Sequence, residues 1–415
     1  MRILYFALDC PLPANNGLRQ RTWTVLRALR AEGCQITLVC LQSSESAALP
    51  AHVKQVCDGF WSIGHRAASL SQRGDWSRRL GALAARQPYA VRRFRSTAAR
   101  ALLERVWAGG GWDALICDTV YATVNLPAAI QPLVLNHHNI EHRLFDSYAA
   151  QETRAWRQAA ARWEGRRVQR YEIEVGRRTA LNLVCSEVDR LHLLEQQPEA
   201  LVHVVPNIAP EAGAPAPVEP EPDLVVFQGA LDWLPNRDAM DFFLTAIWPQ
   251  VLAEHPTARL QVVGRNPPAA FLARHRGRPR VEFTGTVAEV RPYLARAAVA
   301  IAPLRMGSGT RLKILEAAAM ARAIVATPIG AEGLHFLPGV EIEIAASAAG
   351  FAAQVNALLR SPSRRYALGA AALARVEADY SFTALRRSLR EALQAVAPAA
   401  ASEAALNPAL VFQAS

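Results

Sequence analysis

The sequence predicts an α/β protein with two doubly wound halves, each built on a parallel sheet. Short apolar strands alternate with longer helical segments along most of the 415 residues, which is typical of parallel sheets covered by helices. Six prolines fall between residues 206 and 222, and the alternating pattern starts again after them. The length fits two to three domains. We therefore expect two domains joined by a proline-rich linker.

The chain begins with a predicted β–α–β unit. Ile3–Leu8 is an apolar strand, Leu18–Glu32 is a helix that ends at Gly33, and Ile36–Leu41 is the next strand. Ligands of doubly wound sheets bind beyond the carboxyl ends of the strands. The loop containing Asn16-Gly17 therefore lies where a ligand is expected, although it lacks the Gly-x-Gly-x-x-Gly fingerprint of dinucleotide-binding proteins.

The remaining elements of the first half follow the same alternation. Residues 66–108 are predicted to be helical and basic, and Gln151–Arg178 forms a long helix rich in Arg and Glu. Ser186 follows the predicted strand Leu181–Cys185 and has the position of an N-cap for the next helix. The remaining predicted strands are Ala114–Cys117, Leu133–Leu135, Leu181–Cys185 and Val202–Val205. We place the first domain at 1–205 and the linker at 206–223.

A cluster of histidines follows the strand at Leu133–Leu135. It reads Asn136-His137-His138-Asn139-Ile140-Glu141-His142. The segment leaves a strand and has no His-Glu-x-x-His spacing, so a zinc site is disfavoured. A polar cluster at the carboxyl end of a strand fits a loop that faces a substrate better.

The second half repeats the strand–helix pattern. Its predicted helices are Asp238–Glu254, Thr310–Ala321, 347–360 and 362–396. Its predicted strands are Leu224–Phe227, Leu260–Val263, Val281–Phe283, Val299–Pro303, Ile324–Ala326 and Ile342–Ile344. We place the second domain at 224–385, with a helix end and frayed tail at 386–415, and expect a ligand-binding cleft between the domains.

Residues 305–333 contain a glycine-rich loop that leads into a helix. Gly307 and Gly309 allow the backbone to approach a ligand, and Thr310 is the expected N-cap. Arg311 and Lys313 place two cations at the helix N-terminus, where they oppose the helix dipole. Two cations at this position need a compensating anion, and a bound phosphate group would supply one.

Glu316 lies one turn later on the same helix, where its carboxylate could accept hydrogen bonds from sugar hydroxyls. An ordinary loop and helix with solvated charges is the alternative interpretation for each residue taken alone.

Composition limits the class of protein. No apolar run reaches the roughly 18–20 residues of a membrane span, and the N-terminal apolar run is too short for a signal peptide. Six cysteines without a Cys-x-x-Cys pair fit a reducing cytoplasm. The net charge of +10 comes almost entirely from arginine, since Lys54 and Lys313 are the only lysines. Nucleic acid, an anionic membrane surface and acidic small molecules are the candidate partners, and nucleic acid ranks last because no nucleic-acid-binding motif accompanies the charge.

Several motifs resemble those of one enzyme family. The specific ones are Gly229-x-Leu231-x-Trp233-x-Pro235-Asn236-x-Asp238, Val263-Gly264, Gly285-x-Val287, Gly307-Ser-Gly-Thr-Arg-Leu-Lys-Ile-Leu-Glu316 and Thr327-Pro-Ile-Gly-Ala-Glu-Gly333. The weaker ones are Asn16-Gly17, His138-Asn139, Ser186-Glu187 and Pro206-Asn207. With these motifs, about residues 1–385 resemble the retaining glycosyltransferases of family 4, in particular the exosortase-associated sugar transferases of bacterial exopolysaccharide clusters. The resemblance implies the GT-B fold, in which two Rossmann-like domains face each other across a cleft.

The resemblance also implies roles for individual residues. His138, with His137 as the rival assignment, would face the transferred sugar and the acceptor, and Glu316 would bind the ribose. Arg311 and Lys313 are the other candidate catalytic residues, because the loop after the first strand of the second domain lacks the lysine usual in the family. Ser308 replaces the first Glu of the family's Glu-x₇-Glu pattern. The candidate donor-binding residues are Asn16, Gly17, Gly229, Asn236, Gly264, Gly307, Ser308, Gly309, Thr310, Glu316 and Glu332.

The function implied is transfer of a sugar from a nucleotide-diphosphate sugar to a glycan or lipid-linked acceptor with retention of configuration. We expect no cofactor and no metal, since fixed cations and a helix N-terminus can stabilise the leaving diphosphate and no suitable Asp-x-Asp occurs. We expect a cytoplasmic protein that meets the anionic surface of the inner membrane through its Arg-rich N-terminal domain. A nucleotide-sugar 2-epimerase and a non-catalytic nucleotide-sugar-binding protein are the alternatives.

Overall fold

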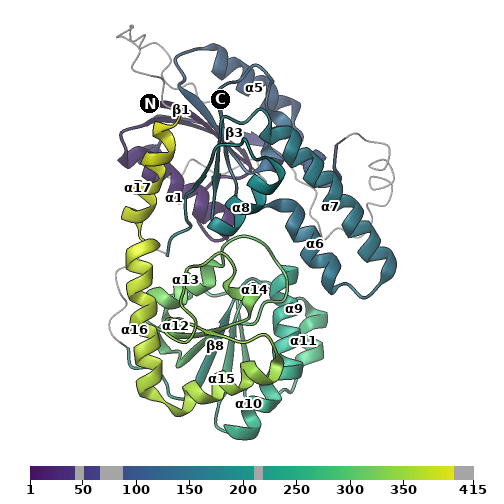
Figure 1. The fold of residues 1–415 in the computed structure, drawn as a ribbon, viewed down its shortest axis with the longest axis vertical. Helices are drawn as coiled ribbons and strands as arrows, with labels where there is room; N and C mark the ends of the chain where they lie inside the picture. The colour runs from purple at the N-terminus through teal and green to yellow at the C-terminus, as the bar shows by residue number, and fades with distance from the viewer. Residues whose placement is uncertain (43–50, 66–86, 210–217, 397–415) are drawn as a thin grey trace. The chain divides into compact units, whose positions relative to one another are not determined.

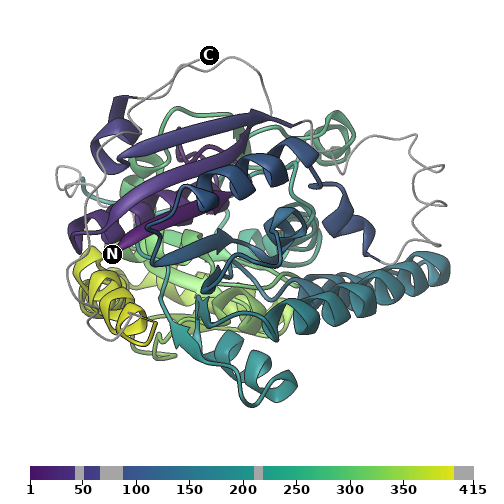
Figure 2. The ribbon, with the colours of Figure 1, turned by 90° about the horizontal axis from the view of Figure 1, so that it is seen from above.

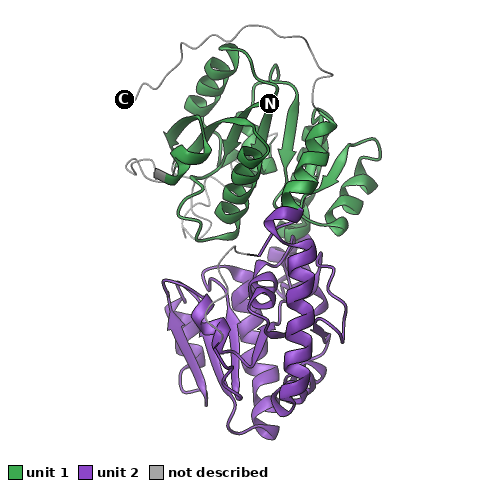
Figure 3. Ribbon diagram, turned by 90° about the vertical axis from the view of Figure 1, so that its left-hand side faces the viewer, with its two compact units in different colours: residues 1–145, 159–205, 385–415 green, residues 146–158, 206–384 purple. Residues whose placement is uncertain are grey.

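The computed structural model describes residues 1–42, 51–65, 87–209 and 218–396. The chain divides into two compact units (Figure 3). Unit 1 comprises Met1–Phe145, Ala159–Val205 and Leu385–Ser415, and unit 2 comprises Asp146–Gln158 and Pro206–Ala384. Unit 2 thus includes residues 146–158, which lie within the range 1–205 of the predicted first domain, and unit 1 includes the described residues 385–396 after the predicted second domain.

Unit 1 contains a parallel sheet of seven strands in the order β3-β2-β1-β4-β5-β6-β7. The strands are β1 (Arg2–Ala7), β2 (Gln35–Gln42), β3 (Gly59–Gly64), β4 (Ala114–Asp118), β5 (Leu133–Asn136), β6 (Leu181–Val184) and β7 (Val202–Val204). The strand order reverses between β1 and β4. Ligands of doubly wound sheets bind at this reversal, beyond the carboxyl ends of the two strands.

The predicted inner strands of unit 1 are present because their side chains are buried on both faces of the sheet. Ile3–Ala7 and Ala114–Cys117 have no exposed surface. β3 has no counterpart among the predicted strands. It is an edge strand with a mostly half-exposed sequence, including Trp61, so it lacks the continuous apolar run by which the inner strands were recognised.

The helices of unit 1 begin and end at recognisable signals. Asn16 Oδ1 accepts a hydrogen bond from the Arg19 backbone N–H at 2.9 Å and caps α1 (Gly17–Ala31), and Gly33 follows its end with a φ of 78°. Ser186 caps α8 (Glu187–Gln196), as predicted. The other helices are α2 (Ala51–Val56), α4 (Tyr89–Arg92), α5 (Thr97–Ala108) and η1 (Val120–Asn125).

The long helix predicted from residue 151 to 178 is α7 (Ala155–Gly176), and it is preceded by α6 (Glu141–Gln151), which was not predicted. The predicted start was wrong by four residues, and the predicted basic helical segment 66–108 falls partly outside the described residues. The C-terminal helix α17 (Phe382–Gln394) lies beside α1 (Figure 1, Figure 2), where Glu32 accepts from Arg386 Nε at 2.8 Å and from Arg390 Nε at 2.6 Å.

Unit 2 contains a parallel sheet of six strands in the order β10-β9-β8-β11-β12-β13. The strands are β8 (Leu224–Gln228), β9 (Arg259–Val263), β10 (Val281–Gly285), β11 (Val299–Ala302), β12 (Ala323–Ala326) and β13 (Glu343–Ile344). The order reverses between β8 and β11, so the loops after these two strands share the ligand-binding edge.

The helices of unit 2 bury two apolar clusters, one on each face of the sheet. One cluster contains Phe243, whose ring contacts those of Trp248 and Phe351, and the other contains Ile314 and Leu315. The helices are α9 (Leu234–Phe242), η2 (Phe243–Ile247), α10 (Trp248–Glu254), α11 (Ala269–His275), α12 (Arg291–Arg296), α13 (Leu312–Ala319), α14 (Pro328–Ala331), α15 (Ala348–Arg360) and α16 (Pro362–Asp379). Figure 1 shows the sheet between them.

Two predicted helix starts in unit 2 were wrong. α9 begins at Leu234 instead of Asp238, because Pro235 stands in its first turn and tolerates that position. α13 begins at Leu312 and its N-cap position is Arg311, so Thr310 is not the N-cap. The turn at Gly309, with a φ of 75°, delays the start of the helix.

All six cysteines lie in the described residues, where they are buried and form no disulfide. No helix in the described part of the chain is long and apolar enough to cross a membrane.

Candidate functional site

In unit 2, the predicted residues gather at the reversal of the strand order. Gly229 directly follows β8 and has a φ of 156°, a conformation that L-amino acids other than glycine rarely adopt. A Cβ atom there would lie 2.8 Å from Asn236 Nδ2 and 3.0 Å from Lys313 Nζ. Glycine is therefore required for these three residues to lie together.

Lys313 is the cation at the centre of this group. Its Nζ donates to Asn236 Oδ1 at 2.8 Å and lies 4.3 Å from the centre of the Phe227 ring. Asn236 is itself held by the Ala230 carbonyl, which accepts from Nδ2 at 2.9 Å. Burial of the ammonium group, and then the charge of Arg311, lower the pKa of Lys313 to about 7. Lys313 is thus a fixed cation whose charge an added anion would stabilise.

Arg311 organises the loop that precedes α13. The residue is buried, and its Nη1 donates to the carbonyl oxygens of Ser308 and Gly309. Its Nη2 lies 3.9 Å from a carboxylate oxygen of Glu332. Arg311 therefore fixes the backbone of the loop, a role that the sequence did not predict, in addition to placing positive charge beside Lys313.

Glu316 is positioned by a residue that the sequence did not single out. Gln228, the last residue of β8, donates from Nε2 to Glu316 Oε2 at 2.5 Å and to the Lys313 carbonyl at 3.2 Å. Gln228 is buried, whereas Glu316 and Lys313 are half-buried. One amide side chain thus connects the end of β8 to the helix that carries both predicted ligand residues.

The other predicted residues of unit 2 have identifiable structural contacts. A Cβ at Gly264 would lie 2.4 Å from the Gly229 carbonyl oxygen, so Gly264 permits the close approach of two loops. The Gly307 backbone N–H donates to Ser147 Oγ at 2.6 Å, and a Cβ there would lie 3.1 Å from Arg311 Nη2. Thr310 and Ser308 belong to the same loop. These residues shape the backbone around Lys313.

In unit 1, Asn16 and Gly17 form the N-terminus of α1, which starts beyond the carboxyl end of β1. The loop before them is held by Arg19, whose Nη2 lies 2.8 Å from Asp9 Oδ2. The amide N–H groups of the first helical turn favour an anion.

His138 pairs with a buried carboxylate. Its Nε2 lies 2.7 Å from Oδ1 of Asp118, which ends β4 and is completely buried. The Asp118 carboxylate also accepts from Tyr5 Oη at 2.9 Å, from Asn136 Nδ2 at 2.6 Å and from Thr22 Oγ1. This set of donors fixes the carboxylate, which in turn fixes the orientation of the His138 ring.

The electrostatics of this pair are set by its partners. Burial alone would raise the pKa of Asp118, but the charge of His138 and the hydrogen bonds from His138, Thr22 and Tyr5 lower it. A carboxylate only accepts hydrogen bonds, so the ionised Asp118 places the proton of a neutral His138 ring on Nε2 and leaves Nδ1 as the acceptor.

The other two histidines of the cluster face different partners. His137 Nε2 lies 3.0 Å from Asn182 Oδ1 on β6, and burial lowers the pKa of His137. His142 Nδ1 lies 2.6 Å from Glu172 Oε2. The described residues include no group of three or more His, Cys, Asp or Glu that could hold a metal ion. Of the two rivals, His138 is the one that belongs to the network at the strand reversal.

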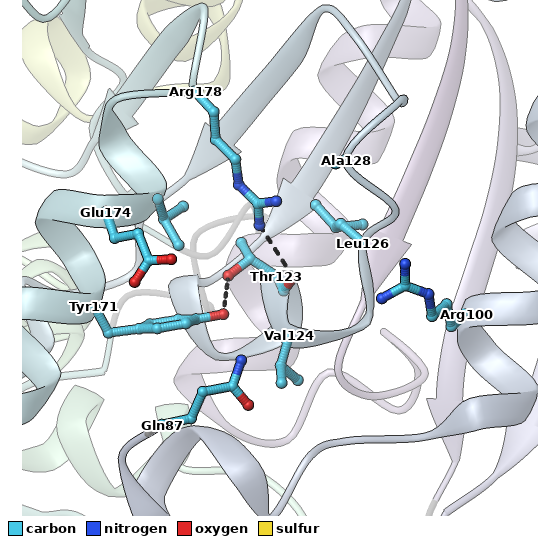
Figure 4. Close-up of a pocket in the computed structure, with 10 residues that line it drawn as sticks. Gln87, Arg100, Thr123, Val124, Leu126, Ala128, Tyr171, Glu174 and Arg178 are labelled. Atoms are coloured by element: carbon cyan, nitrogen blue, oxygen red, sulfur yellow. Dashed lines mark hydrogen bonds between the residues drawn. The ribbon is translucent and has the colours of Figure 1, made fainter. Parts of the chain in front are cut away.

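A cavity of about 240 Å³ lies elsewhere in unit 1 (Figure 4). Thr123 Oγ1 and the Tyr171 hydroxyl lie 2.9 Å apart within it, and Arg178 Nη2 donates to the Thr123 carbonyl at 3.4 Å. None of the predicted site residues lines it. The lining residues are Gln87, Arg100, Thr123, Val124, Leu126, Ala128, Tyr171, Glu174, Val175 and Arg178.

One family model matches part of the chain. Residues 222–361 match the family model described as glycosyl transferases group 1. The matched segment covers about a third of the chain. It contains the whole cluster around Lys313. Among curated proteins, none matches the chain by sequence.

Solved structures with low sequence identity share the fold of the whole chain. Sucrose-phosphate synthase from Thermosynechococcus elongatus is 15% identical with a TM-score of 0.70, over 95% of this chain and 98% of that one. A Staphylococcus aureus TarM mutant in complex with fondaparinux, α-GlcNAc-glycerol and UDP is 10% identical with a TM-score of 0.66, over 95% and 100%. HepE of Anabaena in complex with UDP and glucose is 12% identical with a TM-score of 0.63, over 95% and 99%. The prediction of the GT-B fold is therefore confirmed.

The residues that orient other site residues were not predicted from the sequence. Asp118, Asn136 and Thr22 orient His138, while Gln228 orients Glu316. A signal existed for two of them, since Asp118 and Gln228 are polar residues at the ends of otherwise apolar central strands. Polar side chains buried at such positions need partners, and the partners mark the site.

Proposed function

We propose that this protein is a glycosyltransferase that moves a sugar from a nucleotide-diphosphate sugar to an acceptor. The observation that carries the proposal is the cluster of Gly229, Asn236, Lys313 and Glu316 at the strand reversal of unit 2, inside the segment that matches the group 1 family model. A fixed cation, a glycine and a carboxylate at that edge are the groups needed for a diphosphate and a ribose.

The diphosphate would be bound by positive charge and by backbone N–H groups. Lys313 supplies an ammonium group next to Gly229, where the absence of a side chain leaves the backbone accessible. Arg311 adds charge and holds the loop that begins α13, whose first N–H groups favour an anion. Charge that builds on the leaving diphosphate would be stabilised by these fixed groups.

The nucleoside would be bound through Glu316. Its carboxylate accepts from Gln228 through Oε2, and a carboxylate has further capacity to accept hydrogen bonds from the two ribose hydroxyls. The Gln228 contact also restricts the rotation of the carboxylate, which lowers the entropic cost of binding.

In unit 1, His138 would contact the transferred sugar or the acceptor hydroxyl. Asp118 holds the imidazole, and the N-terminus of α1 at Asn16 and Gly17 would favour a phosphate group of the donor. We infer retention of the anomeric configuration by front-face attack, with the leaving phosphate helping to remove the acceptor proton. No metal is needed if Lys313 and Arg311 stabilise the leaving group.

The acceptor is proposed to be a glycan or a lipid-linked sugar. HepE has been solved with UDP-glucose, and the TarM mutant with UDP and α-GlcNAc-glycerol. A donor of the nucleotide-diphosphate class and an acceptor that carries a sugar are accordingly the substrates to test first. We also propose that the protein is peripheral to the inner membrane and takes part in exopolysaccharide synthesis.

The experiment begins with a thermal-shift panel of nucleotide-diphosphate sugars. A donor should raise the melting temperature of the wild type, because it binds only the folded state, and should raise that of Lys313→Met much less. Lys54→Met is the matched control, since Lys54 is exposed on α2 and is the only other lysine. Release of nucleoside diphosphate should then depend on added acceptor. Release that is independent of acceptor, or a panel without any stabilising donor, would contradict the proposal.

A further inference from the structure

Helix α7 exposes two tryptophans on one face. Trp156 is 56% exposed and Trp163 is 40% exposed. Residues seven apart lie two turns apart on the same side of a helix, and the residues between them on this side, Ala159 and Ala160, are small and exposed. The α7 face, defined here as exposed residues 154–170, thus presents aromatic surface without bulky polar side chains between the rings.

Arginines surround these tryptophans. Residues 154–170 contain six arginines and one glutamate, Glu164. The guanidinium of Arg157 lies 5.1 Å from the centre of the Trp156 ring, and that of Arg167 lies 4.5 Å from the centre of the Trp163 ring. The remaining arginines, Arg154, Arg162, Arg166 and Arg170, are exposed and form no ion pair within the described residues. The α7 face therefore combines two exposed indoles with concentrated positive charge.

We propose that the α7 face binds the surface of an anionic phospholipid bilayer. Indole rings prefer the boundary between headgroups and acyl chains, where one edge is apolar and the other is hydrated. Arginine side chains near such a surface are attracted to its negative charge. Both features lie along one helix, so the helix can rest in the plane of the interface with its rings inserted.

Other partners fit the α7 face less well. A second copy of the same face would bring arginine against arginine, which is unfavourable. A single-stranded nucleic acid stacks successive bases on aromatic rings, but rings seven residues apart on a helix are about 10 Å apart along its axis, well beyond the spacing of stacked bases. Binding to a bilayer requires only that the indole rings and the arginine side chains lie on the same side of the helix.

The inference goes beyond the transfer reaction, because it concerns a surface that contains none of the proposed substrate-binding residues. Its test needs neither a donor nor an acceptor. Failure to bind vesicles would leave the thermal shift with a donor unchanged, and the absence of a donor would leave vesicle binding unchanged.

The test is flotation of the full chain with vesicles of phosphatidylcholine, alone or mixed with phosphatidylglycerol. The wild type should float with the anionic vesicles at low salt, and should float much less at high salt or with the zwitterionic vesicles. The double variant Arg166→Gln/Arg170→Gln should weaken binding about 30-fold. Trp156→Ala/Trp163→Ala should weaken it at least about tenfold, including the part that resists salt.

Matched controls separate the α7 face from general charge and hydrophobicity. Arg276→Gln/Arg278→Gln removes the same charge from unit 2, where neither arginine has an ion pair among the described residues, and Trp61→Ala removes an exposed indole from β3. These variants should float like the wild type. Equal loss in the controls, no flotation of the wild type, tighter binding to single-stranded RNA than to vesicles, or a dimer that Trp156→Ala/Trp163→Ala dissociates would each overturn the proposal.

Discussion

The charge on Lys313 should control the affinity for a nucleoside diphosphate as a function of pH. The pKa of Lys313 is about 7, so about half of the ammonium groups are protonated at pH 7 and about one in ten at pH 8. If only the protonated form binds the diphosphate, the dissociation constant should rise about tenfold for each pH unit above 7. At pH 7 binding should take up about half a proton.

Lys313→Met removes the charge and keeps an unbranched apolar stem of similar length. A charge-assisted hydrogen bond contributes roughly 1.5–3 kcal/mol, so the variant should bind about 10-fold to 100-fold more weakly at pH 6. Near pH 9, where the wild-type lysine is largely neutral, the two affinities should converge. Lys54→Met should follow the wild type at every pH.

The assay is isothermal titration calorimetry with whichever of UDP, GDP, ADP and CDP stabilises the wild type most. Titrations from pH 6 to pH 9 give the slope, and repeating each in two buffers of different ionisation enthalpy gives the proton uptake. Equal slopes for the wild type and Lys313→Met, or no proton uptake at pH 7, would refute the role of Lys313.

Lys313→Met should also change the stability of the protein, in a direction that follows from the pKa of Lys313. The folded pKa of Lys313 lies below its unfolded value, so the unfolded chain binds more protons between about pH 7 and pH 10.5. The contribution of Lys313 to stability therefore rises with pH across this window. The melting temperature of Lys313→Met minus that of the wild type should be largest near pH 7 and should shrink toward pH 10.

Three further predictions concern the residues around the two predicted ligand sites. Gly229→Ala should abolish donor-induced thermal stabilisation, because its Cβ would meet Asn236 and Lys313, whereas Gly110→Ala, which also has a positive φ but has open space around it, should cost only about 1 kcal/mol of stability and leave donor binding unchanged. Gln228→Met should raise the KM for the donor about tenfold by releasing Glu316, with a smaller change in kcat; an unchanged KM would show that Glu316 needs no positioning. Asp118→Asn should lower kcat at least about tenfold while the donor still binds, because an amide can donate to His138 Nε2 and reverse its tautomer; a wild-type kcat would exclude His138 from the reaction.

The sequence was sufficient to predict the two parallel sheets, since each inner strand is a short apolar run between glycines, prolines or helix signals. The edge strand β3 and the starts of two helices were predicted less reliably from the sequence. β3 is half-exposed and was missed, while α9 and α13 start at residues set by Pro235 and Gly309 instead of at Asp238 and Thr310. Such boundaries depend on the conformation of one or two residues, which composition and periodicity do not encode.

Contacts between residues far apart in the chain could not be predicted from the sequence either. Asp118 and His138 are 20 residues apart and meet because β4 and β5 are adjacent and parallel, and Gln228 reaches Glu316 across 88 residues. The side chains that would contact a ligand were predicted from loop motifs. The side chains that hold them were not, because their partners are determined by strand order.

The most direct test of the proposed function is the rate of acceptor-dependent nucleoside diphosphate release at pH 7 by the wild type, Lys313→Met and Lys54→Met with the stabilising donor. The account predicts release by the wild type and by Lys54→Met at similar rates, and a rate at least about 100-fold lower for Lys313→Met, because stabilisation of the leaving diphosphate would be lost. Near-wild-type release by a folded Lys313→Met variant would contradict it.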